Sequence, residues 1–451
     1  MAGPAIRFSE MAKVLSKSHK VTMGVPNNTG FTISGVTVVK YGANNLESLV
    51  KQCDIIIISG SFNLMDYPFL KKAGQVLVVD LYAPHVLETL ELESCHEKRD
   101  KQIADLNDLI STGDFFICAS ERQRDFWLGV LTSTHRIDAV AYKQDSTLRK
   151  LIDIVAFGLP AESPVHSKQV LKGAYPGIKT DDTVLIWAGG VYDWFDVKSL
   201  ILAMETIGRT RPDIKLFFMG VKHPNPNTVR MRAVDEAISL SQKLGLYDKT
   251  VFFNDWVPYD ERASYLLEAD IGLSLHFDHL ETRFSFRTRM LDYIWAALPI
   301  VCTRGDTLAD LVDKFGLGKT VPPKSPDDVT AAVLDLANKP DDLALCKAAF
   351  PPVQSEYSWE KVVQPLVEFC EKPQRTRRDL AGNIGFEDGL IRLPIAEKMI
   401  IDKNNHITNL EDIISSYNEF PGSWLHVITR IYRRLFKRNA RKSVIGTGGH
   451  E

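Results

Sequence analysis

Several common signatures are missing from the sequence, and each absence narrows the class of protein. No stretch reaches the roughly 18 consecutive apolar residues that a membrane-spanning helix needs, and no charged segment leads into an apolar one at the start. The six cysteines show neither a C-x-x-C pair nor the Cys–His spacing of a zinc site. The net charge of −3 gives no basic field for nucleic acid. We therefore expect reduced thiols, a cytoplasmic location, no metal site and no nucleic-acid partner.

Apolar runs alternate with stretches of helical spacing along most of the 451 residues. The runs lie at 19–25, 36–42, 53–60, 76–82, 115–120, 153–160, 183–190, 214–220, 250–255, 269–276 and 298–303. Near-continuous apolar runs are typical of parallel strands that are buried on both faces. We predict an α/β protein with two doubly wound, Rossmann-like domains, residues 1–165 and 166–372, facing each other across a ligand-binding cleft. A tail at 373–451 follows them.

A Gly-Pro turn opens the chain directly before a helical pattern. In "GPAIRFSEMAKVL" the apolar residues Ala5, Phe8, Met11, Ala12 and Leu15 share one face, and the charged residues, Arg7 included, lie mostly off it. Gly3 then sits at a helix N-terminus, where free N–H groups and the helix dipole favour a diphosphate. A plain helix start explains the same residues equally well.

The second domain contains a stronger phosphate signal. In "LIWAGGVYDWFDVKSLILAM" a strand runs into a Gly189-Gly190 turn and then into a helix, an arrangement that can cradle a phosphate. The alternative is a tight turn beside two core tryptophans, Trp187 and Trp194.

Polar residues are densest in "ADIGLSLHFDHLETRFSFRTRMLDYIWAALPIV". Within seventeen residues, from 276 to 292, this stretch places His276, Asp278, His279, Glu281, Arg283, Arg287, Arg289 and Asp292. The Arg287 guanidinium can fork onto phosphate oxygens, and Glu281 can accept hydrogen bonds from sugar hydroxyls. The histidine spacing forms no convincing metal site. An ion-pair network without a ligand is the competing interpretation.

Five stretches together resemble the bacterial family 4 glycosyltransferases, which have the GT-B fold. They are "GPAIRFSEMAKVL", "FFICASERQRDFWLG", "FFMGVKHPNP", "DWVPYDERASYLLEADIGLSLH" and "ETRFSFRTRMLDYIWAALPIV", and the resemblance covers about residues 1–372. It implies transfer of a sugar from a nucleotide-sugar donor with retention of configuration and without a bound metal. It also implies that the second domain holds the donor and the first domain the acceptor. No cofactor is implied beyond the donor, which is a substrate.

The donor residues of the family carry over with departures. The resemblance places Asp292 where the second of two glutamates normally binds ribose hydroxyls, and Glu281, eleven residues earlier, in the role of the first. An Arg and a Lys normally hold the diphosphate, but Gly190 and either Phe195 or Asp196 stand there. Since a diphosphate removed from water needs compensating charge, we expect Arg287 and Arg289 to replace them, with Lys198 behind.

Three further residues take roles from the resemblance. Trp256 and Val257, in the turn "DWVP", are expected to meet the nucleotide base. His85, in "VVDLYAPHVLE", is expected to face the transferred sugar, although a capping or core histidine fits it slightly better.

The start of the chain departs most from the family. Similar sequences have about twenty residues before the Gly-Pro loop, which form the first, central strand of the sheet. Without that strand the sheet should be unstable or reorganised, because its neighbours lose backbone partners. We therefore expect Met1 to be an internal methionine of a longer reading frame.

The end of the chain changes character near Arg375. A polar linker precedes "FPGSWLHVITRIYRRLFKRNARKS", whose apolar and basic residues separate onto opposite helical faces over 420–442. This pattern predicts a helix that lies on the inner face of the cytoplasmic membrane, close to a lipid-linked or cell-surface glycan acceptor. Packing on protein is the alternative. A catalytically silent GT-B subunit that binds or scaffolds is the alternative to an enzyme.

Overall fold

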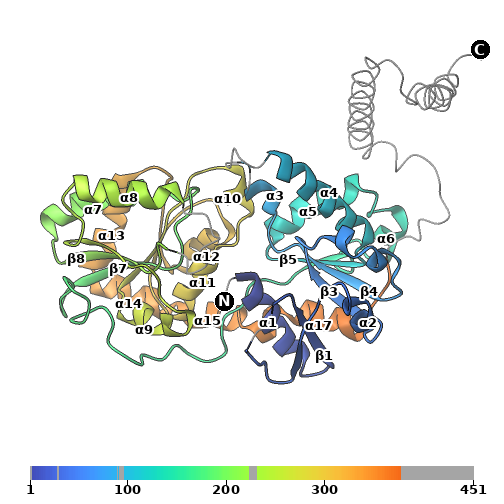
Figure 1. The fold of residues 1–451 in the computed structure, drawn as a ribbon. Coiled ribbons are helices and arrows are strands. Elements are labelled where there is room, and N and C mark those ends of the chain that lie inside the picture. Colours follow the sequence, from blue (N-terminus) through green and yellow to red (C-terminus); the bar gives the residue numbers. More distant parts are fainter. Residues whose placement is uncertain (1–2, 28–29, 89, 91–95, 223–230, 377–451) are drawn as a thin grey trace, which may run out of the picture. The chain divides into compact units, whose positions relative to one another are not determined.

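The computed structural model describes residues 3–27, 30–88, 90, 96–222 and 231–376 (Figure 1). Residues Met1–Arg377 form one compact unit. The predicted linker and the basic amphipathic helix at 420–442 lie outside the described residues, so the interpretation of the tail stays a prediction.

The first half of this unit is built from six parallel strands and the helices between them. The strands are β1 (Val21–Val25), β2 (Val36–Lys40), β3 (Ile55–Ser59), β4 (Val76–Asp80), β5 (Phe115–Cys118) and β6 (Ile152–Ile154). The helices are α1 (Gly3–Leu15), α2 (Leu46–Val50), η1 (Leu64–Asp66), η2 (Pro68–Lys72), α3 (His85–Glu88), α4 (His96–Thr112), α5 (Glu121–Ser133) and α6 (Ala139–Gln144). Alternate strand residues face the two cores, since Leu77 and Val79 pack with α4 and α5 while Val78 packs with α1.

These six strands do not form one sheet. Strands β1 and β2 form a parallel pair, and β3 to β6 form a separate four-stranded sheet in chain order. The four isoleucines of β3 are buried only at Ile58, although such a run is typical of a strand covered on both faces. Within the described residues no strand precedes α1, and β3 has a strand partner on one side only. The strands of the first half are therefore divided between two sheets.

The second half holds one six-stranded parallel sheet. The strands are β7 (Thr183–Trp187), β8 (Ile214–Phe218), β9 (Val251–Phe253), β10 (Ile271–Ser274), β11 (Ile300–Thr303) and β12 (Gly318–Val321), in the order β12-β11-β10-β7-β8-β9. The chain leaves β7 toward β8 and later returns to the other side of β7 with β10. The predicted doubly wound α/β architecture is thus confirmed, and each apolar run holds a strand. Strand β12 escaped prediction because "GKTV" has one buried residue, Val321.

Helices cover both faces of the six-stranded sheet. They are α7 (Val197–Thr210), α8 (Arg232–Lys243), η4 (Tyr259–Glu261), α9 (Arg262–Glu268), α10 (Leu280–Phe284), α11 (Thr288–Trp295), α12 (Thr307–Phe315) and α13 (Pro326–Asn338). Leu185 and Trp187 of β7 share a core with α7, α8 and α13, whereas Val184 and Ile186 share one with α9, α11 and α12. Alternation along one strand therefore feeds two layers.

Four C-terminal helices lead back to the first half. They are α14 (Pro340–Ala348), α15 (Phe350–Glu356), α16 (Trp359–Val362) and α17 (Gln364–Glu371). The ring of Phe369 stacks on Phe115 of β5 at 4.1 Å between centroids. The backbone N–H of Leu159 donates to the carbonyl of Tyr357 at 2.7 Å. The two halves are therefore joined by packing as well as by the connecting segment.

Helix α1 buries a charge where the sequence pattern placed apolar residues. Arg7 is 1% exposed, whereas Ala5 is exposed, so the predicted apolar face is wrong at both positions. The Arg7 guanidinium donates to both carboxylate oxygens of Asp80 at 2.7 and 2.9 Å, and to the carbonyl of Ala156 at 3.1 Å. A carboxylate at the end of β4 therefore turns the helix by fixing its arginine inward.

The five cysteines that fall within the described residues are free thiols. None of the helices in that part of the chain combines the length and the apolar character that crossing a membrane requires.

The buried Arg7–Asp80 pair yields a stability prediction. Asp80→Asn leaves the Arg7 charge buried without a counter-charge, so we expect the free energy of unfolding to fall by about 3 kcal/mol. Urea denaturation followed by fluorescence measures it. Glu10→Gln, which breaks the partly exposed Lys13–Glu10 pair, is the control and should change stability by less than about 1 kcal/mol. Equal effects of the two substitutions would show that the buried pair has no special role.

Candidate functional site

A cavity of about 280 Å³ lies where the six-stranded sheet changes direction. The loops that follow β7 and β10 meet there, and an antiparallel bridge joins Phe195 to His276. Ligands of open α/β sheets bind at this kind of switch point. The lining residues are Tyr82, Ala83, Pro84, Glu88, Ala188, Gly189, Gly190, Tyr192, Trp194, Phe195, Glu281, Ser285, Phe286, Arg287, Thr288, Arg289 and Asp292.

Six of the residues predicted from the sequence meet in this cavity. They are Gly189, Gly190, Glu281, Arg287, Arg289 and Asp292. Gly189 has φ of +82°, a left-handed conformation that side chains disfavour, so the turn after β7 depends on glycine there. Neighbouring loop positions contribute Tyr192, Trp194 and Phe195, of which only Trp194 was considered from the sequence, as a core tryptophan.

Arg289 carries a buried charge without a carboxylate partner. Its guanidinium lies over the rings of both Trp187 and Phe195, 4.2 Å from each centroid, and Nη2 donates to the carbonyl of Gly190 at 2.5 Å. Within the described part of the chain no carboxylate oxygen lies within 4.0 Å of it, and Nη1 is buried without a hydrogen-bond partner. Burial lowers the pKa of Arg289 to about 10. An anion in the cavity would complete this environment.

Arg287 lies in an ion-pair network. Its Nη2 lies 2.8 Å from Glu281 Oε2, and its Nε lies 3.7 Å from Asp306 Oδ2. Asp306 is also 3.4 Å from His276 Nε2; burial acts to raise its pKa, but His276 and Arg287 hold that pKa below the usual value. The competing interpretation of an ion-pair network therefore describes Arg287 well, although its side chain still borders the cavity.

Asp292 is held by a third arginine. Arg262 Nε donates to its Oδ1 at 3.1 Å, and the Arg262 guanidinium is stacked between the rings of Tyr259 and Trp295. Burial raises the pKa of Asp292, and the Arg262 charge opposes that shift. Asp292 keeps a place in the cavity wall with one oxygen committed to this pair.

The buried hydroxyl of Tyr293 fixes the turn after β7 to the sheet. It accepts a hydrogen bond from the N–H of Ala188 at 2.9 Å and lies 2.8 Å from the carbonyl of Leu273. Gly272 lets the ring pass, because a Cβ there would lie 2.6 Å from it. Helix α11 thereby sets the position of Gly189 relative to Arg289.

The first half of the unit contributes Tyr82 and Glu88. The Tyr82 hydroxyl donates to the carbonyl of Phe286 at 3.2 Å, and the Arg7 guanidinium lies over the Tyr82 ring at 4.8 Å. Glu88 ends α3 and was missed, although it stands three residues after His85 in the same quoted stretch. Burial, and then the charge of Glu281, raises the pKa of Glu88. The two glutamates therefore belong to one charge cluster.

The other predicted site residues do not line this cavity. His85 begins α3 and lies against the carbonyls of Ala83 and Gly60, and burial lowers its pKa. Trp256 packs over Gly220, and Val257 is buried in the core. Gly3 begins α1 as predicted, and Lys198 is exposed. Among the described residues no three His, Cys, Asp or Glu side chains gather as metal ligands.

Removal of the charge should affect the unfolding free energy differently at the two cavity arginines. Arg289→Met keeps an unbranched side chain and removes an uncompensated charge, so we expect the unfolding free energy without ligand to change by less than about 1 kcal/mol, or to rise. Arg287→Met strands two buried carboxylates and should cost about 3 kcal/mol or more. Chemical denaturation of both variants measures the contrast. A loss from Arg289→Met as large as that from Arg287→Met would contradict the assignment of an uncompensated charge.

Comparisons with known proteins bear on the second half of the unit and on the fold. Residues 182–339, which contain the six-stranded sheet, match the family model described as glycosyl transferases group 1. No curated protein matches the chain.

Solved structures share the architecture at low sequence identity. Sucrose-phosphate synthase from Thermosynechococcus elongatus is 14% identical with a TM-score of 0.61, and the match covers 82% of this chain and 93% of that one. WaaG, a glycosyltransferase involved in lipopolysaccharide biosynthesis, is 13% identical with a TM-score of 0.56, and the match covers 83% of this chain and 97% of that one. Anabaena HepE in complex with UDP is 14% identical with a TM-score of 0.57, and the match covers 82% of this chain and 96% of that one.

At this identity the likeness shows the fold, and it confirms the resemblance to GT-B glycosyltransferases, while family 4 remains the finer prediction. The chain has the GT-B fold with two Rossmann-like domains, and the second of them matches the glycosyl transferases group 1 family.

Proposed function

We propose that the protein is a retaining glycosyltransferase that moves a sugar from a nucleotide-diphosphate donor to a glycan or lipid-linked acceptor without a metal. The observation that carries this proposal is Arg289, a buried guanidinium that faces the cavity with no carboxylate within 4.0 Å among the described residues. Buried charges are normally paired. A diphosphate beside the Gly189-Gly190 turn would supply the missing charge.

The remaining cavity residues fit the other parts of such a donor. Glu281 offers carboxylate oxygens, which bind sugar hydroxyls well. Asp292 is available for ribose hydroxyls through the oxygen that Arg262 leaves free. HepE, with the same fold, has been solved with UDP and with UDP-glucose, which supports a nucleotide-sugar donor here.

The proposed reaction exchanges one bond for another. The bond from the anomeric carbon to the phosphate oxygen breaks, and a bond from that carbon to the acceptor oxygen forms on the same face. The proton of the acceptor hydroxyl passes to the departing phosphate oxygen. Arg289 stabilises the charge that develops on the diphosphate, and a group placed in advance for developing charge lowers the barrier.

The charge network around Arg287 favours a second candidate. Glu281 and Asp306 already compensate Arg287. The resemblance places Gly190 and either Phe195 or Asp196 where the family holds a cationic pair. A catalytically silent GT-B subunit that binds a nucleotide sugar within a glycan assembly system would show these features. Such a subunit would bind the donor at the Arg289 site but would not catalyse transfer.

Nucleotide binding tests the proposal. We expect UDP-, GDP- or dTDP-sugars, screened by thermal shift and then by calorimetry, to include one that binds. Arg289→Met should weaken that ligand about 10- to 100-fold, the value of a charge-assisted hydrogen bond. Arg209→Met, at an exposed position of α7, is the control and should bind normally.

Turnover separates the two candidates. The transferase should slowly hydrolyse the donor that binds, in the presence of EDTA. Binding without any hydrolysis or transfer favours the silent subunit, and hydrolysis abolished by EDTA overturns metal independence. Failure of every donor to bind, or unchanged binding in Arg289→Met, contradicts the Arg289 site itself.

We also propose that the tail attaches the protein to the inner face of the cytoplasmic membrane. The basic sequence over 420–442 supports this, since each Lys or Arg near anionic lipid contributes about 1 kcal/mol. The full chain should co-sediment with phosphatidylserine vesicles and not with neutral vesicles. Deletion of 420–451 should abolish this co-sedimentation. Equal sedimentation of both proteins would contradict it.

A further inference from the structure

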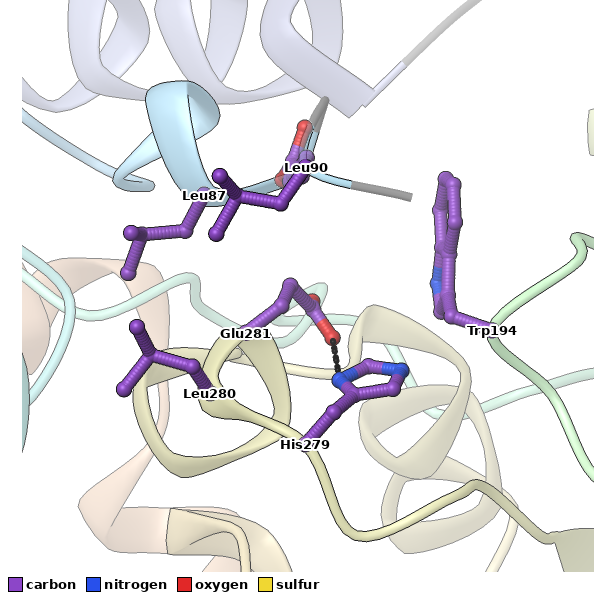
Figure 2. Close-up of a pocket in the computed structure, with 7 residues that line it drawn as sticks. Leu87, Leu90, Trp194, His279, Leu280 and Glu281 are labelled. Atoms are coloured by element: carbon purple, nitrogen blue, oxygen red, sulfur yellow. Dashed lines mark ion pairs between the residues drawn. The ribbon is translucent and has the colours of Figure 1, made fainter. Parts of the chain in front are cut away.

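A second, smaller cavity adjoins the first. We call it the leucine cavity; it has about 60 Å³ and is lined by Leu87, Glu88, Leu90, Trp194, His279, Leu280 and Glu281 (Figure 2). Glu88, Trp194 and Glu281 also line the larger cavity, so the two spaces share a wall. At about 10–15 Å³ for each water-sized group, it has room for roughly four to six such groups, which suits part of an alkyl chain. A sugar ring is larger and would have to lie along the shared wall, in the larger cavity.

One side of the leucine cavity is apolar. Leu87, Leu90 and Leu280 gather on one side of Glu281, and Trp194 stands on the other (Figure 2). Leu90 is 47% exposed and Leu280 is 46% exposed, and they come from different halves of the unit. Single exposed leucines are common, but leucines from two elements that converge on one hollow indicate an apolar ligand.

The other side is polar and holds an uncommitted acceptor. Glu281 is engaged by Arg287 at 2.8 Å and by His279 Nδ1 at 3.9 Å (Figure 2). Glu88 has no ion-pair partner within 4.0 Å among the described residues, and it borders both cavities. Burial, and then the charge of Glu281, raises the pKa of Glu88, and a hydroxyl that donates to Glu88 would stabilise its ionised form.

An aromatic stack lies beside the two glutamates. The Trp194 ring is stacked on Tyr192 with 4.8 Å between centroids and 3° between planes. A preformed aromatic stack offers a flat apolar surface beside the two glutamates, and sugar rings combine a face of C–H groups with hydroxyls at the rim. The leucine cavity therefore presents an aromatic plane, a carboxylate and an aliphatic pocket within one space.

On the basis of the proposed transferase function, we propose that the leucine cavity and the wall that it shares with the larger cavity form the acceptor site, and that the acceptor is an amphipathic glycoside. Its sugar lies against Trp194 and donates a hydroxyl hydrogen bond to Glu88. Its apolar substituent lies against Leu87, Leu90 and Leu280. Glu88 acts here by positioning the hydroxyl, because the transferred proton passes to the phosphate oxygen.

Paired glycosides test this inference on the full chain. Methyl and octyl glycosides of glucose, galactose and mannose are titrated, below the micelle concentration, into protein saturated with UDP. We expect an octyl glycoside to bind at least about tenfold more tightly than its methyl counterpart, since burial of two methylene groups suffices for that factor. Glu88→Ala should weaken both members of the pair by a similar factor, and Glu88→Gln should weaken them less.

A matched pair of surface leucines provides the control. Leu280→Gln should remove most of the octyl preference and leave methyl glycoside and UDP binding unchanged. Leu345→Gln, at a position 70% exposed on α14, should leave the preference intact. Equal binding of methyl and octyl glycosides, or an octyl preference that survives Leu280→Gln, overturns the acceptor site while UDP binding still supports the transferase. Absence of UDP binding overturns both.

Discussion

The buried guanidinium of Arg289 is the constraint on which the account of this protein depends. Two aromatic rings and one carbonyl surround it, but no carboxylate of the described residues lies within 4.0 Å. Desolvating such a charge is unfavourable, and burial lowers its pKa to about 10. A group that is unfavourable for folding and yet borders a cavity is best explained by a ligand of opposite charge.

The same cavity separates two kinds of electrostatics. Near the Gly189-Gly190 turn the uncompensated charge is positive, whereas Glu88 and Glu281 form a carboxylate cluster that shares a wall with the leucine cavity. A nucleotide sugar has the same asymmetry, with an anionic diphosphate and a neutral, hydroxyl-rich sugar. The Arg7–Asp80 pair acts on the cavity indirectly. Arg7 lies over the ring of Tyr82, and the Tyr82 hydroxyl donates to the carbonyl of Phe286, the residue before Arg287.

The sequence predicted the parts of the molecule whose signals are local. Uninterrupted apolar runs located their strands, and the glycine turn and the polar cluster met in one cavity because parallel strands place their carboxyl ends at one edge. Contacts between distant residues were not predictable: Asp306 compensates Arg287, and Asp80 turns Arg7 inward against the apolar pattern. Glu88 was missed because no sequence motif marks it as a site residue in preference to His85. Only the structure of α3 shows that Glu88, and not His85, borders the cavity.

A crystal structure of the protein with UDP tests the central claim most directly. The account predicts that the diphosphate lies beside the Gly189-Gly190 turn with an oxygen within about 3 Å of Arg289 Nη1, the ordinary length of such a hydrogen bond. A diphosphate bound elsewhere, with Nη1 of Arg289 still unpaired beneath an empty cavity, would contradict it.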